Sequence, residues 1–189
     1  MRFTVACGLA AVCLLLGSAS SSALAQKIKM TTSQGEIVLE LDAAKAPKTV
    51  DNFVQYVRAG HYNGTVFHRV IESFMIQGGG FSQDMKEKPT RAPIELESHN
   101  GLSNVRGAVA MARTMDPNSA TAQFFINVKD NDFLNAANSR DGNGYAVFGK
   151  VVSGMDVVDR IRAVKTGNKG PFQDVPLEPV LIIKAAIQE

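Results

Sequence analysis

The residues best suited to chemistry are concentrated in one segment, Val66–Phe81 (VFHRVIESFMIQGGGF). This segment holds a permanently charged hydrogen-bond donor, Arg69, followed closely by the apolar and amide side chains of Phe74, Met75 and Gln77. A guanidinium donates in a fixed planar fork and needs no proton transfer to act. Taken alone, the segment is equally consistent with a buried pair of strands that carries one stray arginine.

Other kinds of site are disfavoured by what surrounds their candidate residues. The glycine run at 78–80 lacks the Lys-Ser/Thr and the strand-to-helix context of a phosphate loop. His61, His68 and His99 lack metal-ligand spacing. The acidic stretches at 130–132 and 141–144 lack the full loop and distal glutamate of a calcium site. We therefore expect no metal and no cofactor, and we expect His68 to face the opposite side of its strand from Arg69.

Elements that could position these residues alternate with clusters of Gly, Asn and Asp. Two helices are predicted, one from Pro47 to a stop at Gly60 and one over Met155–Val164. The segments Ser82–Gly101 and Asn135–Gly144 are predicted to be surface loops. The strand candidates are Lys27–Thr32, Glu36–Asp42, Val66–Val70, Phe74–Gln77, Gly107–Ala112, Gln123–Val128, Tyr145–Val152 and Pro179–Ile187. About eight strands with two helices predict an all-β barrel or sandwich.

Four dense segments together carry a family resemblance. They are FHRVI-x-x-FM-x-QGG-x-F at Phe67–Phe81, MA at Met111–Ala112, AQFFI at Ala122–Ile126 and VFGKV at Val147–Val151. In order and spacing they resemble the cyclophilins, the cyclosporin-binding class of peptidyl-prolyl cis-trans isomerases. The resemblance covers nearly all of the chain after residue 25. Because its loops are compact and its first 25 residues resemble an export signal, as described below, the sequence is most similar to the periplasmic bacterial branch.

This resemblance implies a closed eight-stranded antiparallel barrel, capped by two α-helices, with a proline site on its outer face. Arg69 matches the family's catalytic arginine, and Gln77 would orient Arg69 or a substrate carbonyl. Ala112, Arg113 and Thr114 match the strip that pairs with substrate backbone. The positions that match the wall of the proline pocket are Phe74, Met75, Gln77, Gln123, Phe125 and Leu134.

Three positions depart from the best-known eukaryotic pattern. Phe133 stands where many members have tryptophan, Tyr145 where many have histidine, and Arg113 where many have asparagine. The family uses mainly backbone groups at the last position. The first two departures resemble those of bacterial members, and they predict weak cyclosporin binding with isomerase activity retained.

Arginine among apolar side chains suits the chemistry that the family performs. Resonance in the X-Pro amide gives a rotation barrier of ~18–20 kcal/mol, and rotation exposes a lone pair on the proline nitrogen. An arginine that donates to that nitrogen or to the prolyl carbonyl favours the twisted state over both planar states. No covalent intermediate is required.

The composition excludes several classes of protein. The chain has 189 residues, 45% of them hydrophobic and 20% charged, which excludes a disordered or collagen-like chain. A net charge of +2 gives no basic stripe, so no nucleic-acid partner is expected.

The first 25 residues have the features of a cleavable secretory signal. Arg2 precedes the apolar run Val5–Gly17, and Ala23–Ala25 is an A-x-A cleavage signal. Cleavage would make Gln26 the first residue of a cysteine-free mature domain, 26–189, exported to the periplasm and not inserted in a membrane. An uncleaved anchor is the alternative interpretation.

Two functions remain compatible with the sequence. The favoured one is an isomerase, expected to be monomeric, that acts on proline-containing peptides and on unfolded or folding exported proteins. The alternative is a non-catalytic module or holdase that grips proline-containing segments. The presence of Arg69 favours the enzyme, because binding of a proline-containing segment alone requires only apolar side chains.

Overall fold

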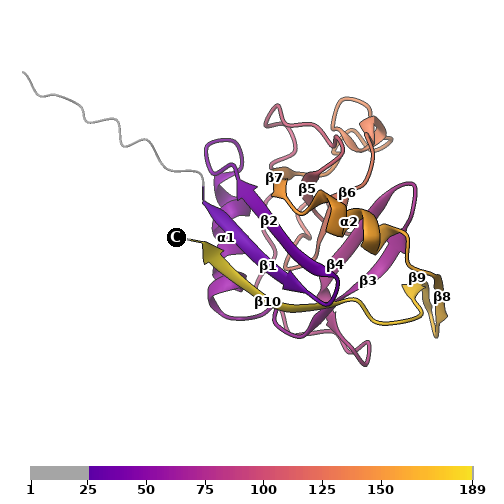
Figure 1. The fold of residues 1–189 in the computed structure, drawn as a ribbon. Helices are drawn as coiled ribbons and strands as arrows, with labels where there is room; N and C mark the ends of the chain where they lie inside the picture. Colours follow the sequence, from indigo (N-terminus) through magenta and orange to yellow (C-terminus); the bar gives the residue numbers. More distant parts are fainter. Residues whose placement is uncertain (1–25, 189) are drawn as a thin grey trace, which may run out of the picture.

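Eight antiparallel strands close into a barrel in the computed structural model, which describes residues 26–188 (Figure 1). Around the barrel the order is β1-β10-β3-β4-β6-β5-β7-β2, and every neighbouring pair is antiparallel. The strands are β1 (Lys27–Thr32), β2 (Gly35–Leu41), β3 (Thr65–Ile71), β4 (Met75–Ser82), β5 (Ala108–Met111), β6 (Phe124–Asn127), β7 (Val147–Ser153) and β10 (Leu181–Gln188). The predicted fold class is confirmed.

Two helices lie on opposite sides of the barrel in Figure 1. In α1 (Pro47–Arg58), proline occupies the first turn, where its missing N–H costs nothing. In α2 (Met155–Arg162), the chain enters the helix through Gly154, whose φ of 88° few other residues tolerate. Among residues 26–188, no helix combines the length and apolar character needed to cross a membrane.

The barrel interior is a packed core built from both helices and the inward side chains of the strands. Phe53 of α1 meets Phe124 edge-on, with ring centroids 5.5 Å apart, and Phe148 at 5.0 Å. Val158 and Ile161 of α2 belong to the same core and are fully buried. Side chains therefore fill the interior, so a substrate site has to lie on the outside of the barrel.

Strand alternation creates a second apolar cluster on the outer face. Successive side chains of a strand point to opposite faces, so Ile76 enters the core while Met75 points outward. Phe125 likewise points outward between Phe124 and Ile126, which are core residues. We call the resulting group the outer cluster; its buried members are Met75, Ala108, Ala110, Phe125, Leu134 and Val147, and its partly buried members are Ile71, Phe74, Leu102, Ala112 and Tyr145.

A hairpin and a short turn were not predicted from the sequence. A two-stranded hairpin forms from β8 (Thr166–Lys169) and β9 (Phe172–Pro176), outside the barrel sheet. A short 3₁₀ turn also forms at Asp132–Leu134.

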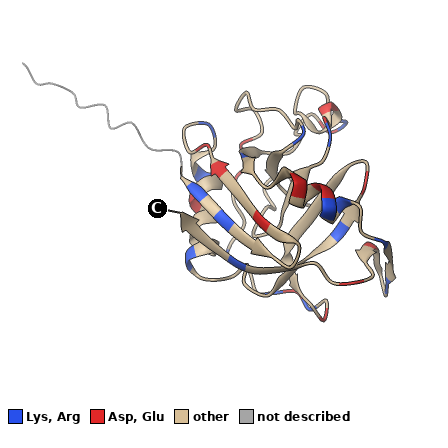
Figure 2. Ribbon diagram, viewed as in Figure 1, with Lys and Arg blue, Asp and Glu red and all other residues tan. Residues whose placement is uncertain are grey.

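Both predicted surface loops are confirmed as largely irregular segments. In the ribbon of Figure 2, acidic and basic residues are interspersed along the visible elements, and the basic residues form no continuous stripe.

Several element ends differ from their predicted positions by one to five residues. Phe74 lies in the turn before β4, and that strand extends to Ser82 instead of ending at Gln77. Tyr145 precedes β7. The proposed leader, including Cys7 and Cys13, lies outside the described residues.

Candidate active site

Arg69 stands at one end of a row of residues that crosses four strands. It pairs with Gln77 across β3 and β4, Gln77 pairs with Phe125 of β6, and Phe125 pairs with Ala110 of β5. Because paired residues on neighbouring strands lie side by side, this register places the guanidinium-bearing residue beside the outer cluster. The Arg69 side chain is 42% exposed, so it can reach a ligand held against those apolar groups.

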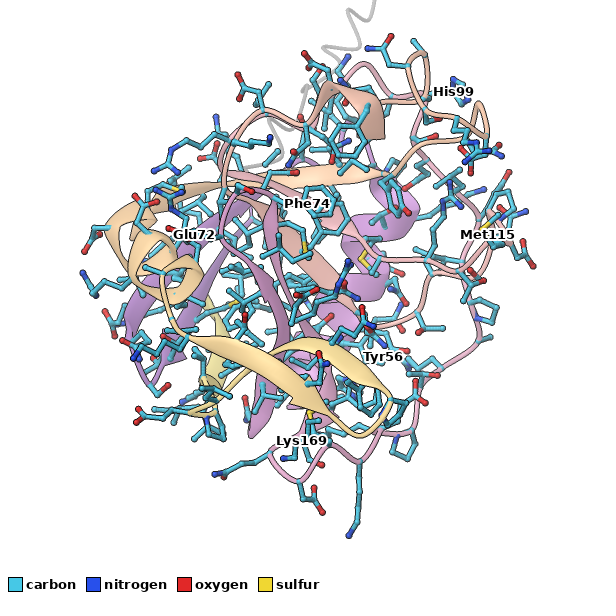
Figure 3. All side chains as sticks on the ribbon, turned by 90° about the vertical axis from the view of Figure 1, so that its right-hand side faces the viewer. Tyr56, Glu72, Phe74, His99, Met115 and Lys169 are labelled. Carbon is cyan, nitrogen blue, oxygen red and sulfur yellow. The ribbon has the colours of Figure 1, made fainter. Side chains whose placement is uncertain are left out.

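The apolar residues matched by the resemblance all belong to the outer cluster. Met75, Phe125 and Leu134 are buried in it, whereas Phe74 and Tyr145 are partly buried at its surface. Tyr145 meets Phe125 edge-on, with ring centroids 5.6 Å apart. Phe74 lies centrally on the face that Figure 3 presents to the viewer. An exposed, partly aromatic surface of this kind can hold a proline ring.

Phe133 extends the aromatic surface outward. It is 54% exposed and stacks on Phe74, with ring centroids 5.6 Å apart and an angle of 28° between the planes. Leu134, its neighbour in the 3₁₀ turn, is buried in the outer cluster. A single short turn therefore supplies both the floor of the site and its exposed rim.

Gln77 does not hydrogen-bond Arg69, so of its two predicted roles the structure gives no support to the orientation of Arg69, while the orientation of a substrate carbonyl stays a prediction. Nε2 of Gln77 donates instead to Oε1 of Gln123 over 3.0 Å. Gln123 packs directly over Gly80, where an added Cβ would lie only 2.5 Å from the glutamine Cγ. The glycine therefore leaves room for Gln123, whose partner Gln77 belongs to the row that contains Arg69.

Two of the three backbone N–H groups in the strip at residues 112–114 already have partners within the chain. The N–H of Ala112 donates to the Gln123 carbonyl over 2.9 Å, and the N–H of Thr114 donates to the Ser119 hydroxyl over 2.9 Å. Neither N–H is therefore free to pair with a substrate. The backbone N–H and C=O of Arg113 have no partner within the part of the chain that the structure describes.

The Arg113 side chain links the strip to the loop that carries Asp141 and Gly144. Its Nε donates to the Gly144 carbonyl over 2.8 Å, and its terminal nitrogens bond Asp141 and the Thr114 carbonyl. The side chain is 4% exposed, and its guanidinium carbon lies 4.7 Å from the centre of the Tyr145 ring. The guanidinium holds the pKa of Asp141 well below its ordinary range through a charged hydrogen bond.

A network of buried asparagines supports the turn that carries Phe74. Asn127 donates to Asn104 over 3.1 Å and accepts from Asn131 over 2.7 Å. Asn131 also donates to the backbone carbonyl of Phe74 over 2.9 Å. The three asparagines are fully buried, so these bonds fix the turn that carries Phe74. Isolated asparagines give no pattern by which the sequence could have revealed this network.

His68 takes no part in the outer cluster. It is 6% exposed and packs edge-on against Phe81, with ring centroids 4.7 Å apart, while the neighbouring Arg69 stays half exposed. Burial lowers the pKa of His68 to about 4, and the nearby Arg69 charge adds to the effect. Within residues 26–188, no three His, Cys, Asp or Glu side chains form a group suited to holding a metal.

A large surface hollow lies beside the site and is not lined by Arg69. It has a volume of about 1160 Å³ and shares only Leu102, Ala108 and Val147 with the outer cluster. Large concave hollows are the usual first hypothesis for a ligand site. Here the charged donor and the exposed aromatic side chains lie elsewhere, so chemistry and not size identifies the candidate site.

Comparison with known proteins decides the family. The model of the "Cyclophilin type peptidyl-prolyl cis-trans isomerase/CLD" family matches residues 27–187. The chain belongs to the cyclophilin family of peptidyl-prolyl cis-trans isomerases. Over 161 residues, this cyclophilin is 62% identical to peptidyl-prolyl cis-trans isomerase cyp18 of Streptomyces antibioticus, covering 85% of the chain and 97% of that protein. It is 58% identical to isomerase B of Escherichia coli K12 over 159 residues, which are 84% of the chain and 97% of that protein.

A solved structure supports the same fold. The cyclophilin-type isomerase of Cryptosporidium parvum, determined in the presence of the dipeptide Ala-Pro, superposes with a TM-score of 0.71. Its sequence is 26% identical, and the match covers 87% of this cyclophilin and 99% of that chain.

Proposed function

We propose that this cyclophilin accelerates X-Pro rotation by hydrogen-bonding the twisted amide through Arg69. The observation that carries this proposal is the cross-strand row that starts at Arg69 and runs through Gln77 to Phe125 and Ala110. The row sets one permanently charged, half-exposed donor beside an apolar outer cluster. The relatives named as isomerases support the reaction class.

The outer cluster would hold the proline ring while the residue before it swings. Burial of a side chain of this size is worth roughly 1.5–3 kcal/mol, enough to keep the ring against Met75 and Phe125 during rotation. The backbone N–H and C=O of Arg113 would pair with the residue that precedes the proline. With both sides held, thermal rotation is confined to the X-Pro bond.

Arg69 would then lower the barrier by differential binding. In the planar amide, resonance delocalises the nitrogen lone pair, so the nitrogen is a poor acceptor. In the twisted state that lone pair is localised, and a guanidinium N–H can donate to it or to the adjacent carbonyl. Apolar neighbours strengthen this hydrogen bond, and each ~1.4 kcal/mol gained raises the rate tenfold. The chain needs no nucleophile and no proton transfer for this step.

A proline-limited refolding reaction tests the proposal. Uncatalysed X-Pro isomerisation takes tens to hundreds of seconds, slow enough to limit folding. Mature protein should accelerate the slow refolding phase of such a client at concentrations well below that of the client. A holdase would instead act only near stoichiometric amounts, and it would slow refolding or change its yield.

We further propose that the clients are exported proteins. The support is the sequence of the first 25 residues, with its charged start, apolar run and A-x-A signal. Protein recovered from its native host should begin at Gln26 and fractionate outside the cytoplasm. An N-terminus at Met1, or a membrane-embedded product, would contradict this assignment.

A further inference from the structure

We propose that Asp174 is a positioning residue for Arg69, an inference that rests on the proposed function. The two residues come from different elements, Arg69 from β3 and Asp174 from the β8–β9 hairpin. Oδ2 of Asp174 lies 3.9 Å from Nε of Arg69, and the two side chains are 41% and 42% exposed. Within the described chain, this carboxylate is the ion-pair partner of Arg69.

A β-bulge aims Asp174 at β3. In the hairpin, Lys169 pairs with Phe172 and Gly167 pairs with Val175, so Gln173 and Asp174 together oppose the single residue between the two pairs. Bulges of this kind redirect a side chain and are over-represented beside active sites. The placement of the carboxylate is thus a property of the hairpin register.

The backbone of Asp174 is held in a conformation that glycine would adopt without strain. Its φ is +57°, and it is one of two non-glycine residues with positive φ in the described chain. A residue other than glycine in this region costs of order 1 kcal/mol, with Asp and Asn the best tolerated after glycine. An aspartate at a position that favours glycine indicates that its carboxylate has a functional role.

The hairpin is anchored, so Asp174 is a fixed point and not part of a free loop. Phe172 packs on Phe81 of β4 with ring centroids 5.1 Å apart, and Val175 is buried. At the base, Leu177 N–H donates to the Lys165 carbonyl over 2.9 Å. Figure 3 shows the hairpin, with Lys169 labelled, lying across the same face as Phe74.

The ion pair would restrict how the guanidinium can point. An arginine side chain has many rotamers, and each productive encounter must select the one that meets the twisted amide. Gln77 does not supply this restraint, because its amide bonds Gln123. A carboxylate beside Nε leaves the two terminal nitrogens available to donate to the substrate. Asp174 therefore acts on turnover through Arg69 and touches no part of the proline ring.

The test is a double-mutant cycle on kcat. Asp174→Asn removes the charge but keeps the size of the side chain and its tolerance of positive φ. Because half-exposed ion pairs are weak, we expect kcat to fall about two- to fivefold, with peptide binding changed by less than about twofold. In an Arg69→Ala background, Asp174→Asn should have no further effect. Glu36→Gln is the matched control, since it breaks the exposed Lys29–Glu36 pair (2.7 Å) on β1 and β2 and should leave kcat unchanged.

Two further measurements separate positioning from structure. Asp174→Gly relieves the backbone strain, so it should be at least as stable as Asp174→Asn while showing the same loss of kcat. The NMR signal of the Arg69 Nε–H should move in Asp174→Asn and stay in place in Glu36→Gln. An unchanged kcat in Asp174→Asn, or an equal loss in the Arg69→Ala background, would overturn this inference. If Arg69→Ala itself kept the wild-type rate, the proposed function would fail instead.

Discussion

The guanidinium of Arg113 lies over the face of Tyr145, 4.7 Å from the ring centre, and connects two segments that are distant in the sequence. One is the strip that would pair with substrate backbone, and the other is the loop that carries Asp141 and Gly144. Tyr145 in turn contacts Phe125 in the outer cluster. The side chain of Arg113 can therefore affect how well the site binds, although only the backbone of this residue would pair with the substrate.

Replacing Arg113 with alanine should weaken peptide binding more than turnover of the bound peptide. The change leaves Asp141 and the Gly144 carbonyl without their partner and should lower the free energy of unfolding by about 1–3 kcal/mol. Calorimetric titration with a Pro-peptide and urea unfolding would measure the two effects. The control is Lys86→Ala, which breaks the exposed pair with Asp84 and should cost no more than about 0.5 kcal/mol. Equal losses of peptide affinity and of unfolding free energy in the two variants would contradict a supporting role for the Arg113 side chain.

The asparagine network predicts a larger loss of stability at a single position. Asn127→Ala should remove partners from Asn104 and Asn131, both fully buried. Each unsatisfied buried group costs about 1–3 kcal/mol, so the free energy of unfolding should fall by at least about 2 kcal/mol. Denaturant titration measures it, with Asn138→Ala in the exposed loop as the control. Similar denaturation midpoints for the two variants would show that the network contributes little to the stability of the folded state.

His68 should make the protein less stable as the pH falls from 6.5 towards 4. Burial lowers the pKa of the folded imidazole to about 4, whereas the unfolded imidazole titrates near 6.5. Between these values the unfolded state binds the additional proton, so stability is full above pH 6.5 and declines as the pH falls. The difference between these two pKa values lowers the free energy of unfolding by about 3 kcal/mol once the pH is below both. His61 adds to the trend, because partial burial lowers its pKa as well.

Replacing His68 with leucine should remove most of that slope. Urea unfolding at half-unit steps from pH 4.5 to 7.5 measures the slope for both proteins. The exposed His99, changed to glutamine, is the control and should keep the wild-type slope. A His68→Leu variant with the full pH dependence would mean that other groups cause it.

Phe133 predicts weak inhibition by cyclosporin. Phenylalanine supplies apolar area at the rim but lacks the indole N–H that tryptophan would donate. One missing hydrogen bond should cost about 1–3 kcal/mol, or roughly 5- to 150-fold in affinity. Phe133→Trp should therefore be inhibited more strongly, with peptide turnover retained. Titration of the drug against both proteins decides the point, and tight inhibition that is the same in both would show that this position does not set the affinity.

Local pattern predicted an all-β fold with two helices because strands and helices leave periodic signals, whereas the choice of a closed barrel over a sandwich came from the family resemblance. The alternation along β2 and the spacing of Val50, Phe53, Val54 and Val57 in α1 gave those elements nearly correct ends. The hairpin of β8 and β9 leaves no such signal. Its strands, TGNK and FQDVP, lack apolar alternation, because β8 is largely exposed and the hairpin lies outside the barrel sheet.

Side-chain direction was the part of the site that sequence could not supply. The resemblance placed Arg113 on the substrate strip, but the direction of its guanidinium depends on Asp141, 28 positions further along the chain. Gln77 was expected to orient Arg69 or a substrate carbonyl, and its side-chain amide donates to Gln123, 46 positions away. These contacts depend on which loops the barrel brings together, and a linear motif does not record that.

The central claim is that Arg69 stabilises the twisted amide, and exchange within the bound peptide tests it most directly. Two-dimensional NMR exchange at saturating Pro-peptide measures cis–trans interconversion on the enzyme, separately from affinity. A hydrogen bond from a charged donor is worth about 1.5–3 kcal/mol, so Arg69→Ala should slow this interconversion roughly 10- to 150-fold and change the peptide Kd by less than about threefold. Arg69→Lys should also be slow, because lysine lacks the planar fork. Interconversion at the wild-type rate in Arg69→Ala would contradict the mechanism.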